Sequence, residues 1–303
     1  MLSTIPQIHL HAELSLSRLV YGAWRLAEDN DTSTAHIRAK IDACLQQGIT
    51  SFDHADIYGN YSCESLFGKV LAAAPSLREH MQLITKCDIM LTSNHYPERR
   101  IKYYDTSPQH IEYSVNNSLS RLHTDYLDLL LIHRPDPFMD AQATGKALDQ
   151  LIDSGKVRAV GVSNFKTWDW DLLQSAMHHR LVTNQIEISL LERSSFHDGT
   201  LAQLQRLHVK PMAWSPLAGG RLLQTNANTQ ALQSVMQRIA HAQQTTIDQV
   251  ALAWLLAHPA QIIPIIGTNQ LARILDSYKA FNIQMDRQTW FELLTAAQGQ
   301  EVP

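Results

Sequence analysis

Cysteine is scarce in this chain, and its placement excludes two classes of protein. The 303 residues include Cys44, Cys63 and Cys87, an odd number at wide spacing without a CxxC pair. A disulfide framework needs paired cysteines, and a zinc site needs closely spaced Cys or His ligands, so neither is expected. Free thiols fit a reducing compartment, and no metal site is predicted.

Long apolar runs and clusters of one charge are also absent. Residues 1–14 lack the basic start and apolar stretch of a signal peptide, and nowhere do about 18 apolar residues follow one another. Lysine and arginine are spread along a chain of net charge -4, which gives no basic stripe for a nucleic-acid backbone. We therefore expect a cytoplasmic protein that binds neither nucleic acid nor membrane.

No linker rich in Pro, Gly or Ser interrupts the chain, which alternates between short apolar runs and segments of helical periodicity. Residues 127–132 are apolar apart from Asp128, as is typical of a strand covered on both faces. Ser107 and Pro108 suit the N-cap and first position of the preceding helix. We predict a first strand over residues 18–24 and a second strand directly after Gly48. Six further strands are predicted over residues 81–86, 127–132, 159–164, 183–188, 211–217 and 262–267.

This alternation predicts an α/β fold, a (β/α)8 TIM barrel that forms a single domain over residues 1–303. Residues 1–17 are too polar for the core and are expected to form an N-terminal cap. Residues 286–297 add a C-terminal helix. The polar stretch 88–107 is much longer than a usual connection between a strand and a helix, so we expect it to border the substrate pocket.

Ionisable or phenolic side chains stand where three successive strands end. Asp53 and Tyr58 follow the second strand, Lys86 ends the third, and His133 ends the fourth. The C-terminal ends of barrel strands share one rim, where catalytic groups sit, so these four residues are expected to meet in space. Singly, a buried Asp/Lys pair or a lone tyrosine is more often structural, but their occurrence at successive strand ends favours a catalytic role.

Five separated segments of the chain also carry a family resemblance: DHADIYG (53–59), Lys86, LLLIHRPD (129–136), GKVRAVGVSNF (155–165) and WSPL (214–217). In order along the sequence they resemble the aldo-keto reductases, and within that superfamily they are most similar to the bacterial YdhF-like oxidoreductases. The resemblance implies that NADPH passes a hydride to an aldehyde or ketone, which becomes an alcohol. It assigns Tyr58 as the general acid, Lys86 and Asp53 as its supporting pair, and His133 to the carbonyl oxygen.

The chemistry of these residue types suits the roles that the resemblance implies. Hydride addition builds negative charge on the carbonyl oxygen, so a proton donor must lie within hydrogen-bond reach of it. A free tyrosine has a pKa near ~10, and we expect the Lys86 ammonium to favour the phenolate and lower that pKa. Asp53 would keep the lysine protonated and oriented, and His133 would steer the carbonyl by donating a hydrogen bond.

The cofactor would have to be held by the barrel rim, because no GxGxxG segment follows a strand and Gly219-Gly220 lacks the spacing of a Rossmann phosphate loop. The resemblance assigns the nicotinamide carboxamide to Ser163, Asn164 and Gln185, and stacking on the nicotinamide ring to Trp214. An amide offers one acceptor and two donors, which suits that polar cluster. For Ser163 and Asn164, capping of a helix is the alternative interpretation.

The remaining cofactor contacts are also implied by the resemblance. Arg273 matches the contact to the 2′-phosphate, and its planar guanidinium suits phosphate, so NADP(H) is expected rather than NAD(H). A solvent-exposed helix arginine is the alternative for Arg273, and a core aromatic is the alternative for Trp24. Ala272 and Ser277 stand where the family often has Glu and Asn, which leaves the adenine contacts open. The other assigned contacts are Gly22 and Trp24 after strand one, Ser215, Leu217 and Gly219 after strand seven, and Gly267, Thr268 and Asn269, which are expected to open a helix with free N–H groups.

Two other interpretations stay open at this point. A nicotinamide-binding regulatory or redox-sensing subunit with little turnover would keep the barrel, as the aldo-keto reductase-like β subunits of ion channels do. A metal-dependent barrel enzyme that uses Asp53 and His133 would need a carboxylate/His cluster at ligand spacing, which the sequence lacks. A closed barrel has no sheet edge that demands a partner, so we expect a monomer that acts on a small-molecule carbonyl substrate.

Overall fold

The computed structural model describes residues 5–11, 14–224, 226 and 229–303. Its parallel strands are β3 (Val20–Gly22), β4 (Ser51–Asp53), β5 (Gln82–Cys87), β8 (Leu129–Ile132), β9 (Val160–Ser163), β10 (Leu181–Glu187), β11 (Met212–Trp214) and β12 (Ile263–Ile266). They close into one barrel in the order β10-β11-β12-β3-β4-β5-β8-β9. The predicted (β/α)8 barrel is confirmed.

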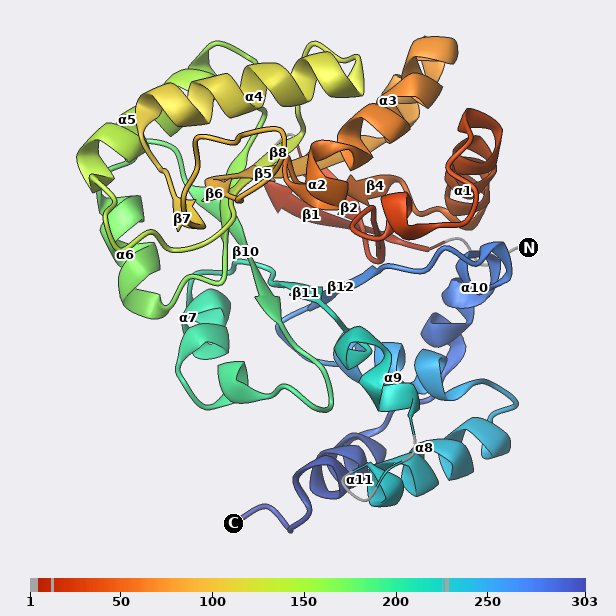
Figure 1. The fold of residues 1–303 in the computed structure, drawn as a ribbon. Coiled ribbons are helices and arrows are strands. Elements are labelled where there is room, and N and C mark those ends of the chain that lie inside the picture. The colour runs from red at the N-terminus through yellow and green to blue at the C-terminus, as the bar shows by residue number, and fades with distance from the viewer. Residues whose placement is uncertain (1–4, 12–13, 225, 227–228) are drawn as a thin grey trace.

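Helices connect the strands and surround the barrel (Figure 1). The N-cap predicted from sequence is present, because the Ser107 hydroxyl accepts a hydrogen bond from the amide of His110. Gly48 ends the first helix at a φ of 83°. The helices are α1 (Thr34–Gln47), α2 (Tyr58–Tyr61), α3 (Cys63–Ala73), α4 (Pro108–Leu122), α5 (Ala141–Asp153), α6 (Thr167–Ser175), α7 (Thr200–Arg206), α8 (Gln230–Ala242), α9 (Ile247–Leu256), α10 (Leu271–Asp276) and α11 (Arg287–Gln298).

Strand β8 illustrates how the apolar runs fold into the barrel. Leu129 and Leu131 belong to the cluster inside the barrel, whereas Leu130 and Ile132 pack in the layer between the strands and the helices. All four side chains are buried. Because successive strand residues point to opposite faces, only a continuously apolar sequence can fill both layers, which explains the run seen in the sequence.

The N-terminal cap is a two-stranded antiparallel sheet of β1 (Gln7–His11) and β2 (Leu14–Ser17). The prediction that this segment is too polar for the core was wrong in part, since Leu14 and Leu16 are buried in the cluster that fills the barrel interior. The amide of Ser17 donates to Ser51 Oγ at 2.9 Å, and Ser51 is the first residue of β4. The hairpin therefore closes the barrel at the N-terminal ends of its strands, opposite the rim on which the site lies.

Two further segments complete the fold. The long stretch 88–107 contains β6 (Ile89–Met90) and β7 (Tyr103–Tyr104), which pair antiparallel and fold the stretch back on itself. At the other side of the molecule, α8 and α11 lie side by side (Figure 1). The rings of Trp254 and Trp290 stack with centroids 4.9 Å apart and attach α11 to α9. Among the described residues, no helix combines the length and apolarity needed to cross a membrane.

Candidate active site

Lys86 lies at the centre of the polar cluster on the C-terminal rim. Its side chain is fully buried, and Nζ donates to Asp53 Oδ2 at 2.7 Å, to the carbonyl oxygen of His54 at 2.7 Å and to the Tyr58 hydroxyl at 2.9 Å. An ammonium has three N–H donors, so each of them has an acceptor. The three acceptors come from one short segment, residues 53–58.

Backbone hydrogen bonds explain why this segment surrounds Lys86. The chain leaves β4 at Asp53 and stays attached to β5, because the amide of His54 donates to Ile84 O and the amide of Asp56 donates to Lys86 O. The segment then turns into α2, which begins at Tyr58. The His54 ring packs edge-on against Phe67 at 4.6 Å between centroids, so this histidine supports the turn from the core side.

Two opposing effects act on the pKa of Tyr58. Burial raises the pKa of Tyr58 above its ordinary value, and the opposing effect of the nearby Lys86 ammonium is smaller. The expected effect of Lys86 is thus present, but desolvation of the phenolate outweighs its attraction to the ammonium. For Lys86, burial lowers the pKa, but Asp53 and Tyr58 more than offset that effect and raise it. The stable state at neutral pH is a phenol beside an ammonium.

His133 faces Tyr58 from the end of β8. The two ring centroids lie 6.1 Å apart with the planes at 77°. Burial, followed by the charges of Lys86, Arg134 and Lys102, holds the pKa of His133 well below its ordinary value, so the ring is neutral. Its Nδ1 atom has no hydrogen-bond partner among the described residues. A neutral imidazole can still donate one hydrogen bond to a ligand.

Gln185 is linked to this cluster in a way that the sequence did not indicate. Its Nε2 donates to Asp53 Oδ1 at 2.8 Å, while the other carboxylate oxygen of Asp53 accepts from Lys86. Asp53 is thus fixed between β5 and β10. Because 132 positions separate the two partners along the chain, no local pattern could have signalled this bond.

A cleft of about 920 Å³ opens above the cluster. Such a volume lies near the upper end of the range for small-molecule sites. Lys86 lies behind this surface, covered by its partners. The lining includes the other residues assigned to the site from sequence: Gly22, Trp24, Asp53, Tyr58, His133, Ser163, Asn164, Gln185, Trp214, Ser215, Leu217, Gly219, Gly267, Thr268, Asn269 and Arg273.

The polar residues near the middle of the cleft are connected to one another. Asn164 Nδ2 donates to Ser163 Oγ at 2.8 Å, and Asn164 Oδ1 accepts from Trp214 Nε1 at 3.0 Å. The alternative that Ser163 and Asn164 cap a helix is wrong, because the N-cap of α6 is Lys166. Asn164 also has a φ of 62°, a conformation that non-glycine residues adopt at a cost and that recurs at functional sites. This network sets the plane of the Trp214 indole.

The far end of the cleft corrects one expectation. Helix α10 begins at Leu271 with Gln270 as its N-cap, so residues 267–269 precede the helix instead of opening it. The Thr268 hydroxyl accepts from the Gln270 amide and forms a local turn there. The Asn269 side chain is also engaged, because it donates to Arg25 O and accepts from the buried Lys40.

Arg273 and Trp24 both face the cleft. Arg273 is exposed on α10 and lines the far end of the cleft, so it is accessible to a ligand there. The Trp24 side chain is 52% exposed, which contradicts the alternative that it is a core aromatic. Packing alone favours glycine at position 22, because a Cβ atom there would lie 2.8 Å from Ile265 Cγ2.

The cationic residues that line the cleft but were not singled out from the sequence include Arg25, Lys102 and Arg134. Arg134 directly follows His133, and Lys102 lies in the 88–107 stretch; both line the cleft and lower the pKa of His133. The signal for Arg134 was its place inside the motif at the end of β8. The signal for Lys102 was its place in a loop that was itself expected to border the pocket, an expectation that the cleft confirms.

A closed parallel barrel with a large cleft at its C-terminal rim is the architecture of a barrel enzyme. Residues 18–296 match the aldo/keto reductase family, and the chain belongs to that family. A 6-dehydroglucose reductase from Agrobacterium fabrum is 54% identical over 98% of this chain and 100% of its own length. The oxidoreductase YdhF from Escherichia coli is 46% identical over 95% of both chains, which confirms the expected similarity to YdhF-like oxidoreductases. The crystal structure of an aldo-keto reductase from Klebsiella pneumoniae in complex with NADPH matches with a TM-score of 0.78 at 25% identity, over 100% of this chain and 97% of that one.

Proposed function

We propose that this oxidoreductase reduces an aldehyde or ketone to an alcohol with NADPH, and that Tyr58 is the general acid. The observation that carries the proposal is the Tyr58 hydroxyl itself, which lines the open cleft and is held at 2.9 Å by a fully buried lysine. A phenol in this position can give a proton to a carbonyl oxygen that approaches from the cleft. Membership of the aldo/keto reductase family supports the same chemistry.

Each residue of the cluster has a separate role in the proposed proton transfer. Burial keeps the Tyr58 proton in place while no substrate is bound. When negative charge develops on a carbonyl oxygen beside it, the phenol can release the proton, and the Lys86 ammonium then stabilises the phenolate. Asp53 holds that ammonium, with Gln185 fixing the carboxylate. The neutral ring of His133 would donate a hydrogen bond to the same carbonyl oxygen and orient it.

NADP(H) is the cofactor that the residues of the cleft fit best, and when bound it supplies the hydride. Ser163 and Asn164 offer hydrogen-bonding groups for the carboxamide, and the Trp214 indole offers a flat apolar surface for the ring. Gly219 and Gly267 have open space where a Cβ would stand, so backbone and ligand can approach each other closely. Arg273 supplies the guanidinium for a 2′-phosphate. The NADPH-bound relative supports this choice.

We also propose a substrate class, a small aldehyde that carries several hydroxyl groups. The name of the Agrobacterium relative, 6-dehydroglucose reductase, supports a sugar with a carbonyl at carbon 6. The lining of the cleft supports it too, because Asn60, Lys102 and Arg134 offer hydrogen-bond donors close to Tyr58 and His133. A purely apolar carbonyl compound would offer these donors no acceptor besides its carbonyl oxygen.

The test is the loss of NADPH absorbance with purified enzyme, using 6-dehydroglucose and a reactive aromatic aldehyde as substrates. Tyr58→Phe keeps the ring and removes the proton donor, so turnover should fall by about 10²- to 10⁴-fold while the Kd for NADPH stays within about twofold of the wild-type value. Retention of turnover within a few-fold would remove Tyr58 from the acid role. A higher kcat/KM for the aromatic aldehyde than for the sugar would contradict the substrate class but not the reaction.

A further inference from the structure

An arginine in the polar 88–107 stretch is buried, although its surroundings in the sequence suggest a solvent-exposed loop. The Arg99 side chain is only 7% exposed, whereas the next residue, Arg100, is exposed. The nearest carboxylate is that of Glu98, at 4.0 Å and itself 69% exposed, so solvent screens this pair. Burial of a guanidinium costs free energy unless the group is hydrogen-bonded, so Arg99 is expected to have hydrogen-bond partners.

The partners of Arg99 come from the last residue of α2 and from its own loop. Arg99 Nη1 donates to the Tyr61 hydroxyl at 2.6 Å, and the same hydroxyl accepts from the amide of Leu91 at 3.1 Å. The Arg99 Cζ atom lies 3.6 Å from the centroid of the Tyr96 ring, and Tyr96 packs edge-on against Tyr61 at 4.9 Å. One tyrosine of α2 therefore binds the loop at two points, by hydrogen bonds and by ring packing.

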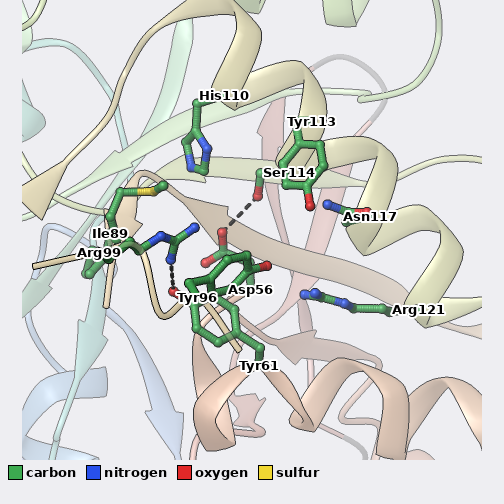
Figure 2. A pocket seen from close by; sticks show the side chains of 11 residues that line it. Asp56, Tyr61, Ile89, Tyr96, Arg99, His110, Tyr113, Ser114, Asn117 and Arg121 are labelled. Carbon is green, nitrogen blue, oxygen red and sulfur yellow. Dashed lines mark hydrogen bonds between the residues drawn. The ribbon is translucent and has the colours of Figure 1, made fainter. Parts of the chain in front are cut away.

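This group of side chains is closely packed. Figure 2 shows the Arg99 guanidinium reaching to the edge of a hollow between Asp56, Tyr61 and the α4 side chains of His110 and Ser114. The hollow measures about 10 Å³, room for about one water molecule. Arg99 therefore fills space as well as making hydrogen bonds. Its removal would leave a cavity and take one hydrogen bond from the Tyr61 hydroxyl, which would keep the bond from the Leu91 amide.

The two parts that Arg99 joins are the two walls of the substrate end of the cleft. Tyr58 and Asn60 line it from α2, and Leu91 and Lys102 line it from the loop. Tyr61 ends the four-residue helix that Tyr58 begins. A bond between Tyr61 and the loop thus links the helix that carries the proposed acid to the loop that carries Leu91 and Lys102.

We propose that Arg99 and Tyr61 are positioning residues that lock the 88–107 loop against α2 and thereby fix the width of the substrate end of the cleft. They act through the residues that line the cleft and need not touch the substrate. The expected effect on kinetics rests on the proposed reductase function, whereas the attachment of the 88–107 loop to α2 by Arg99 and Tyr61, here called the lock, does not. The cofactor end of the cleft, at Arg273 and Gly267, is formed by other elements and should be unaffected.

The kinetic test compares Arg99→Gln, Tyr61→Phe and the double variant with Arg100→Gln, a matched change at the exposed neighbour. Loss of a hydrogen bond to a charged group is expected to raise KM for the aldehyde by roughly 10-fold in each single variant. The double variant should resemble the singles, because both remove the same bond. The Kd for NADPH should stay within about twofold in all four, and Arg99→Lys, which keeps the charge but loses the planar stacking, should recover part of the loss.

A second measurement needs no activity. Hydrogen exchange of the amides of residues 91–102 should be at least about 10-fold faster in Arg99→Gln and Tyr61→Phe, and unchanged in Arg100→Gln. Unchanged protection in the first two variants would overturn the lock whatever the enzyme does. Faster exchange with an unaltered KM would overturn the positioning role. If the wild-type protein reduced no carbonyl compound, the proposed function would fail while hydrogen exchange still decided whether the lock exists.

Discussion

The segment that leaves β4 contributes to two buried polar clusters, and they differ in how completely their groups are paired. Around Lys86, at the cleft, three donors meet three acceptors within 2.7–2.9 Å. Around Asp56, on the closed side, Oδ2 accepts from Ser114 Oγ at 2.8 Å, but Oδ1 has no partner in the described part of the chain. Glu64 beside it accepts from Thr85, and its other oxygen is 3.6 Å from Arg121.

The difference has an electrostatic consequence. Burial, and then the neighbouring Glu64, raise the pKa of Asp56 to about 7. Lys86 is buried as deeply, yet its charged form is favoured, because Asp53 and Tyr58 offset the desolvation. Burial alone therefore does not decide whether a group is charged; the match between donors and acceptors does. The fully paired cluster around Lys86 keeps its ammonium charged, and the incompletely paired cluster around Asp56 holds a carboxyl close to its neutral form.

The largest effect, on both turnover and stability, is expected when the fully paired cluster loses the Lys86 ammonium. Lys86→Met should lower turnover by at least about 10²-fold, since neither the phenolate nor Asp53 would then have a cation. Breaking a buried ion pair should also lower the free energy of unfolding by about 3–5 kcal/mol. Turnover and urea unfolding measure the two effects. Lys69→Met, at an exposed position of α3, is the control and should change neither; near wild-type turnover in Lys86→Met would show that the ammonium is not needed.

A smaller effect is expected at the open end of the cleft. Arg273→Ala should raise the Kd for NADPH by about 10- to 100-fold, because a charged hydrogen bond to the 2′-phosphate is lost, and should leave the Kd for NADH within about twofold. Fluorescence titration with both cofactors measures this. Arg287→Ala, at an exposed residue of α11 outside the cleft, is the matched control. An equal loss for both cofactors would place Arg273 away from the 2′-phosphate.

The smallest effect, a change in stability, is expected in the incompletely paired cluster around Asp56, and its sign depends on pH. The folded pKa of Asp56, about 7, lies above the ordinary 3.8, so its contribution to stability is complete below pH 3.8 and is lost as the pH rises through 7. Asp56→Asn cannot ionise, and its Oδ1 can still accept from Ser114. The variant should therefore gain stability relative to wild type between pH 4.5 and pH 8, by roughly 1–3 kcal/mol.

Thermal or urea unfolding at the two pH values measures this gain. Asp125→Asn, at an exposed aspartate, should change stability by less than about 0.5 kcal/mol at both. If Asp56→Asn destabilised the protein equally at pH 4.5 and pH 8, the carboxyl of Asp56 would be ionised throughout, and the contrast between the two clusters would disappear.

The barrel, and the meeting of the polar side chains on its rim, could be predicted from the sequence, because both depend on local patterns. Apolar runs of strand length alternate with helices, and Asp53, Lys86 and His133 each stand where such a run ends. The parallel arrangement then places these ends on one rim. Strand ends were less well predicted: the first strand was expected over residues 18–24, whereas β3 covers Val20–Gly22.

The features that could not be predicted depend on contacts distant in sequence. Gln185 reaches Asp53 only because β10 and β4 face each other across the closed barrel. The strands β6 and β7 have two residues each, too few for any periodicity to appear. Arg99 stands between the charged residues Glu98 and Arg100 in the sequence, and its burial follows from Tyr61, which belongs to another element. The net pKa of Tyr58 required the depth of burial, which residue types alone do not give.

The double role of the Tyr61 hydroxyl, which accepts from Leu91 and from Arg99, limits how the protein can be re-engineered. Exchanging residues 88–107 for the corresponding stretch of a relative is an obvious route to new substrates, since this stretch forms one wall of the cleft. A graft that brought no arginine in place of Arg99 would leave the Tyr61 hydroxyl short of a donor. Transplanted loops should therefore be chosen together with the residue at position 61, as one unit of exchange.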